Sequence, residues 1–176
     1  MAPEKRDMLF RVTRLRLSLA GLLLSALSVC GAAQAAPSPL AAKAFLVKVY
    51  AGQIHYDTND GAPAVFDPST VALFRLDAKL TPPHKVGAID FDPICWCQDS
   101  KDLSFAVQTI AITSPSTATA SVTSSYPGRV VARMRVQLTL TAAGWRIHDI
   151  VESDAGKSST SSLRALLNRG IHQMGG

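Results

Sequence analysis

The densest group of reactive side chains lies in one segment near the middle of the chain. This segment holds four aspartates and two cysteines, a mixture that could bind a metal ion or transfer protons: Asp90, Asp92, Asp99, Asp102, Cys95 and Cys97. Metal sites built on cysteine usually have three or four nitrogen or sulfur ligands, whereas the nearest histidine, His84, lies eleven residues before Cys95 without a second histidine. We therefore expect no metal site, and we expect Asp92 and Asp99 to cap turns by accepting backbone N–H groups.

Cys95 and Cys97 are separated by one residue, which restricts how they can pair. On an extended strand their Cα atoms would lie about 6.5 to 7 Å apart, at the upper limit for a disulfide. A bridge therefore needs a local turn, and Pro93 could supply it. The pair lacks the helix N-terminus that activates Cys-x-x-Cys thiolates. We interpret it as a structural disulfide or as two buried thiols.

No other segment contains a recognisable catalytic motif. The sequence lacks Gly-x-Ser-x-Gly, a glycine-rich phosphate loop and His-Glu-x-x-His, so we expect no cofactor. His148 is predicted on the outer face of the last strand, next to Arg146. Four arginines at strand spacing indicate a solvated sheet face or a contact for an anionic partner: Arg129, Arg133, Arg135 and Arg146.

The first 35 residues are typical of a secretory signal peptide. Four arginines lie within residues 6–16. The uncharged stretch 17–29 that follows is too short to span about 30 Å of hydrocarbon as a helix. Ala33-Gln34-Ala35 predicts cleavage before Ala36 and an exported product, periplasmic or secreted. The alternative is a lipoprotein anchored through Cys30, because Leu27-Ser28-Val29-Cys30 is similar to a bacterial lipobox.

Composition and charge predict one globular domain over residues 36–176. The chain has 47% hydrophobic and 18% charged residues, which excludes a disordered protein. Of the net charge of +5, the predicted leader carries +3, so the remainder carries only +2. This near-neutral balance argues against nucleic-acid binding.

The hydrophobic periodicity changes from helical to strand-like along this domain. Helices are predicted from Ser38 with an end by residues 55–60, from Asp67 to the Thr81-Pro82-Pro83 stop, and over 161–169, with Gly170 ending the last. Alternating apolar residues predict four strands over 103–113, 117–126, 130–141 and 145–152, with a loop at 153–160. The predicted class is α+β, with helices packed on one side of a curved antiparallel sheet that leaves a concave face.

The last two strands should form a hairpin around Ala143-Gly144. A two-residue turn there places Leu140 opposite Ile147 and Leu138 opposite Asp149. The inward row would then hold one carboxylate, Asp149, among Trp145, Ile147 and Val151. A three-residue turn would shift this register and change the placement.

Four segments together resemble a known family: FDPSTVALFRLD, FDPICWCQD, GWRIHDI and SLRALL. They are similar to the uncharacterised bacterial family called domain of unknown function 3828, across residues 44–167. The most specific match is Asp92-Pro93 with Gln98-Asp99. That family resembles the nuclear transport factor 2-like superfamily, so the resemblance implies a cone of curved sheet closed by helices. It implies little about chemistry.

These observations predict a non-enzymatic exported domain that binds a small ligand or an envelope protein. The contacts would come from the central segment or the concave face, through Asp92, Gln98, Asp99 and Asp149. One alternative is a periplasmic phospholipid carrier, because the last strand and helix are also similar to such carriers. The others are a periplasmic immunity protein and an isomerase-type enzyme with Asp149 as its pocket carboxylate.

Overall fold

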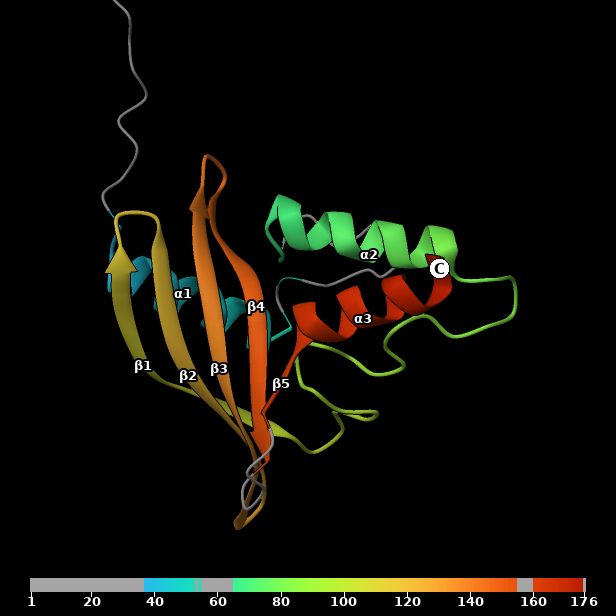
Figure 1. The fold of residues 1–176 in the computed structure, drawn as a ribbon. Helices are drawn as coiled ribbons and strands as arrows, with labels where there is room; N and C mark the ends of the chain where they lie inside the picture. The colour runs from blue at the N-terminus through green and yellow to red at the C-terminus, as the bar shows by residue number, and fades with distance from the viewer. Residues whose placement is uncertain (1–36, 53, 55–64, 155–159, 176) are drawn as a thin grey trace, which may run out of the picture. The chain divides into compact units, whose positions relative to one another are not determined.

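The computed structural model describes residues 37–52, 54, 65–154 and 160–175 (Figure 1). The predicted leader and Cys30 lie outside these residues. The described elements follow in this order: α1 (Pro39–Tyr50), α2 (Pro68–Leu80), β1 (Ser104–Ser114), β2 (Thr117–Tyr126), β3 (Arg129–Thr141), β4 (Gly144–Asp154), β5 (Thr160–Ser162) and α3 (Leu163–Gly175). None of the described helices is long and apolar enough to cross a membrane.

The strands form one antiparallel sheet in the order β1-β2-β3-β4-β5, so the predicted α+β class is confirmed. The four predicted strands are present with ends shifted by at most two residues. The short strand β5 replaces the start of the predicted final helix, because Thr160, Ser161 and Ser162 pair with the end of β4.

Proline marks the first residue of both N-terminal helices, as predicted. Asp67 caps α2 by accepting the N–H of Thr70 at 2.8 Å, whereas the side chain of Ser38 makes no capping hydrogen bond to α1. α1 ends at Tyr50, earlier than predicted. The chain turns there because Gly52 adopts a left-handed φ of 68°.

α3 continues through Gly170, where the sequence predicted its end. A side chain at this position would collide with Ala88, so glycine allows the 81–103 segment to approach the helix closely. Gly170 therefore serves close packing and does not terminate the helix.

The predicted hairpin register is wrong by two residues. Ala142 and Ala143 form the turn, so Leu140 pairs with Trp145 and Leu138 pairs with Ile147. β4 then carries His148 as an extra residue, since Gln137 already pairs with Asp149. This bulge reverses the alternation of side chains, so Ile150 takes the next position in the apolar core and Asp149, although also buried, leaves the inward row.

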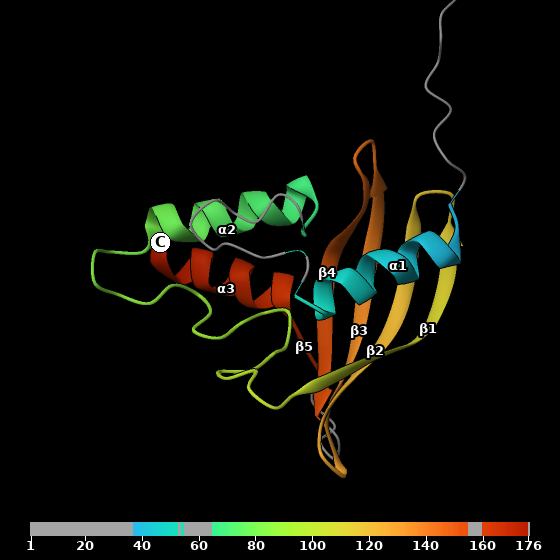
Figure 2. The same ribbon diagram turned by 180° about the vertical axis from the view of Figure 1, so that it is seen from behind.

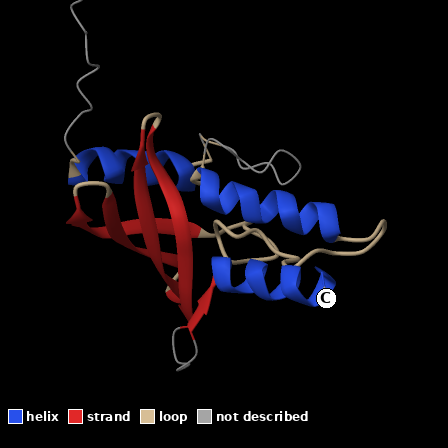
Figure 3. Ribbon diagram, turned by 45° about the horizontal axis from the view of Figure 1, so that its top comes forward, coloured by secondary structure: helices blue, strands red, loops and turns tan. Residues whose placement is uncertain are grey.

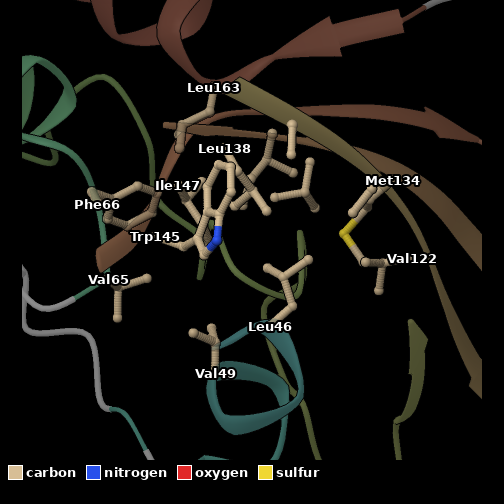
Figure 4. Close-up of a cluster of buried hydrophobic side chains, with 14 of the residues drawn as sticks. Leu46, Val49, Val65, Phe66, Val122, Met134, Leu138, Trp145, Ile147 and Leu163 are labelled. Carbon is tan, nitrogen blue, oxygen red and sulfur yellow. The ribbon is translucent and has the colours of Figure 1, made fainter. Parts of the chain in front are cut away.

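α1 crosses one face of the sheet (Figure 2), which therefore is not an open concave surface. Its buried residues Leu46 and Val49 point towards Trp145 and the apolar side chains of β2 and β3 (Figure 4). α2 and α3 run side by side beyond the β4 edge (Figure 3), and α3 packs on β4 and β5. This arrangement brings the start of α2 against the N-terminal half of β4.

Candidate functional site

The cysteine segment forms a closed turn from Asp92 to Cys97. The backbone N–H of Asp92 donates to the carbonyl of Cys97 at 2.9 Å, and the return bond measures 3.3 Å. Trp96 adopts a left-handed φ of 56°, which brings the Cα atoms of Cys95 and Cys97 to 5.2 Å, within disulfide range. The two sulfur atoms are bonded, so the turn that a bridge requires is present.

The aspartates around this turn accept local backbone hydrogen bonds. Asp92 accepts the N–H of Ile94 and Asp99 accepts the N–H of Lys101, both at 2.8 Å. Gln98 lies exposed between them. The described residues contain no group of three or more His, Cys, Asp or Glu side chains that could hold a metal ion. The central segment thus has the geometry of a capped surface turn.

Asp149 lies elsewhere and anchors the start of α3. Its carboxylate accepts the N–H of Ile150 at 2.9 Å, the N–H of Arg164 at 3.0 Å and the hydroxyl of Ser162 at 2.7 Å. The bond from Arg164 satisfies one of the backbone donors that the first turn of a helix leaves free. The expectation that Asp149 lies on the concave face as a pocket carboxylate is corrected, because the His148 bulge turns it towards α3.

The sequence did not indicate a buried acid paired with histidine. Oδ2 of Asp67 lies 2.7 Å from Nδ1 of His148, and the Asp67 side chain is only 6% exposed, whereas the His148 side chain is 36% exposed. Burial acts to raise the pKa of Asp67, but hydrogen bonds from His148, Thr70 and Ser69 outweigh it. The pKa of this carboxyl therefore lies below its ordinary value.

Backbone hydrogen bonds to β4 place Asp67 beside His148. The N–H of Asp67 donates to the carbonyl of Ile147 at 2.9 Å, and the N–H of Ile147 donates to the carbonyl of Val65 at 2.8 Å, so residues 65–67 lie parallel to β4. The hydroxyl of Thr70 then donates to the carbonyl of His148 at 2.6 Å. These bonds hold the first turn of α2 against the bulge.

Arg164, on α3, joins the polar cluster formed by Asp67, Ser69, Thr70 and His148. Its Nη1 donates to the hydroxyls of Thr70 at 2.6 Å and Ser69 at 3.0 Å. The cluster thus connects α2, β4 and α3 through polar side chains, two of which, Asp67 and Thr70, are buried. Its contacts within the fold indicate a structural clamp.

A cleft of about 220 Å³ lies between α2 and the β3–β4 hairpin. We call it the arginine cleft, because two guanidinium groups join its largely apolar lining: Phe66, Pro68, Val71, Arg75, Thr141, Ala143 and Arg146. Pro68, Val71 and Arg75 share one face of α2 at spacings of three and four. Thr141, Ala143 and Arg146 come from the hairpin.

Arg146 is held in place at this cleft. One guanidinium nitrogen, Nη1, donates to the carbonyl of Trp145 at 2.7 Å, and the guanidinium carbon lies 5.9 Å from the ring centre of Phe45 on α1. Arg133 and Arg135 are exposed, as expected of a solvated sheet face, whereas Arg146 is half-buried. The interpretation of four equivalent arginines therefore does not hold for Arg146.

A second hollow, of about 470 Å³, lies on the sheet. Half of its lining residues carry hydroxyl or amide side chains, and the rest are three apolar residues and one arginine: Gln108, Thr109, Ser121, Val122, Thr123, Val130, Arg133 and Met134. The amide of Gln108 already donates to the hydroxyl of Thr123 at 2.9 Å. The arginine cleft, with two cationic groups beside an aromatic wall, is the stronger candidate for binding a small molecule.

Comparison with known proteins gives no match to a family model, to a curated protein or to a solved structure.

Proposed function

We propose that this chain is an exported, non-enzymatic domain that binds a small anionic molecule in the arginine cleft. The observation that carries the proposal is the convergence of Arg75 and Arg146 on a pocket walled by Phe66, Pro68 and Val71. A carboxylate or phosphate would accept charge-assisted hydrogen bonds from the guanidinium groups, and an apolar body would pack on the walls.

The size of the cleft limits the ligand class. Its volume of about 220 Å³ is below the range of about 300 to 1,000 Å³ that drug-sized ligands occupy. Acyl chains need a larger cavity, so the cleft favours a small aromatic or short aliphatic acid over a phospholipid. Asp149 accepts three hydrogen bonds from β4, β5 and α3 and does not line the arginine cleft, so the structure gives no support to an isomerase-type enzyme with that residue as base.

The compartment and the finer fold class rest on the sequence. The leader pattern supports export with cleavage before Ala36, and the lipobox-like sequence at Cys30 supports a tethered form as the alternative. The family resemblance supports a nuclear transport factor 2-like cone. Asp92, Gln98 and Asp99 offer an exposed polar surface to an envelope protein in addition to the cleft.

Benzoate is a suitable probe, because it combines a carboxylate with a ring of appropriate size, and benzamide is its uncharged analogue. Calorimetric titration should detect benzoate binding that benzamide does not reproduce. Arg146→Gln should weaken benzoate binding by about tenfold or more, through loss of a charge-assisted hydrogen bond. Arg135→Gln, an exposed arginine on the same sheet, is the matched control and should leave the affinity unchanged. Equal binding of both ligands, or equal affinity in both variants, would contradict the proposal.

A further inference from the structure

α1 carries apolar side chains on two opposite faces. Its buried face, Ala42, Leu46 and Val49, packs into the core. The outward face presents a row at spacings of four, three and four: Leu40, Ala44, Val47 and Ala51. Leu40 is 79% exposed and Val47 is 48% exposed. A helix that is apolar on both faces normally buries both, so this outward stripe indicates a contact outside the domain.

The charges on α1 lie beside this stripe. At about 100° per residue, Lys43 and Lys48 fall on either side of it, and the helix contains no acidic residue. The outward face of α1 is therefore an apolar line bordered by positive charge.

We propose that the outward stripe of α1 docks on an anionic membrane surface. A helix that lies in the membrane interface buries its apolar line among the lipid chains and keeps its lysines at the level of the head groups, where anionic lipids attract them. In the tethered form the attachment would be Cys30, which lies nine positions before Pro39, so α1 is close to the membrane along the chain. Nine positions reach at most about 32 Å when fully extended.

The membrane is a better occupant than a second protein surface for this stripe. Protein interfaces are enriched in aromatic anchors, whereas the exposed members here are one leucine, one valine and two alanines. A second copy of the chain would also bring Lys43 and Lys48 against their equivalents on an equally basic helix. The charge pattern is thus complementary to anionic lipid and not to itself.

Vesicle sedimentation tests the proposal on the chain from Gln34 to Gly176, a compact unit that contains the whole described core. We expect this chain to co-sediment with mixed phosphatidylcholine–phosphatidylglycerol vesicles, more weakly with phosphatidylcholine alone, and less as salt is raised. The double variant Leu40→Ser/Val47→Ser should lower partitioning by about tenfold or more. Val86→Ser/Val130→Ser, which changes exposed apolar residues elsewhere, is the matched control and should bind as wild type.

Three results would overturn the proposal. These are no binding of the wild-type chain to either vesicle, equal binding of the two double variants, and a dimer in sedimentation velocity that Leu40→Ser/Val47→Ser dissociates. Circular dichroism identifies a variant that fails to fold, and the single variant Leu40→Ser then replaces it. Benzoate binding should be unaffected by the stripe variants, so this proposal and the proposed function can fail separately.

Discussion

Asp67 and His148 lie 81 positions apart in the chain, and the Oδ2 and Nδ1 atoms of their side chains meet at 2.7 Å. The contact joins the first turn of α2 to the bulge in β4. The arginine cleft begins one residue from Asp67, at Phe66 and Pro68, and two residues from His148, at Arg146. The position of α2 relative to the hairpin, and therefore the shape of the cleft, depends on this pair.

Asp67→Ala should destabilise the domain by about 2 to 4 kcal/mol. The change removes the side-chain cap of α2, the 2.8 Å bond from the N–H of Thr70, and it deprives Nδ1 of His148 of its carboxylate partner. Urea unfolding followed by circular dichroism measures the difference. Asp99→Ala removes a carboxylate that caps an exposed turn, so its cost should stay below about 1 kcal/mol. Similar costs for the two variants would contradict the assigned role of Asp67.

Stability should fall at acid pH partly through Asp67. Its pKa is lowered in the folded state, so its contribution is fully present above the ordinary aspartate value of about 3.9 and is lost as pH falls through the folded pKa. Asp67→Asn should therefore show a shallower loss of unfolding free energy from neutral pH to below about pH 4. Urea unfolding across this range gives the slopes, and identical slopes for wild type and variant would refute the assignment.

Gly170→Ala should be destabilising, although alanine normally stabilises a helix interior by about 1 kcal/mol over glycine. The added Cβ would collide with Ala88, so α3 or the segment that contains Ala88 must move, at a cost of about 1 to 3 kcal/mol. Thermal unfolding measures the sign. Gly175→Ala serves as the comparison, because a Cβ there would meet only Leu80 at an ordinary 3.7 Å. A stabilising Gly170→Ala would show that the close approach is absent.

Replacing both Cys95 and Cys97 by serine should lower the melting temperature modestly. The bridge closes a very short loop, so its entropic contribution should lie well below the roughly 3 kcal/mol of a fifteen-residue loop. Differential scanning calorimetry of the double variant, with reduced wild type as the control, measures the effect. Benzoate binding should persist, and its loss in the double variant would show that the central turn forms part of the site.

Local patterns explain which elements the sequence predicted. The alternation of apolar and polar residues predicted the strands because β2 and β3 each bury one face. Pro39 and Pro68 predicted the first residues of α1 and α2. The hairpin turn was misplaced because Ala142, Ala143 and Gly144 are all small, and either pair of neighbours can form a two-residue turn. The local pattern alone did not distinguish the two registers.

The candidate site was not predictable, because its parts come from distant segments. The bulge at His148 accompanies contacts with Asp67 and Thr70 on α2, and no local signal in β4 requires it. Arg75 follows Val71 on one helical face, but the approach of the hairpin to that face is a property of the tertiary packing. The segment that contains Cys95 and Cys97 was more conspicuous in the sequence. Its carboxylates Asp92 and Asp99, however, only accept backbone hydrogen bonds from neighbouring residues.

The most direct test of the central claim is a map of where benzoate binds. Titration of the ¹⁵N-labelled domain with benzoate should produce saturable amide shifts that centre on Val71, Thr141 and Ala143, with none of comparable size in Arg146→Gln. Shifts confined to the Asp92–Cys97 turn, or to Gln108 and Thr123 in the sheet hollow, would place the ligand elsewhere and contradict the account.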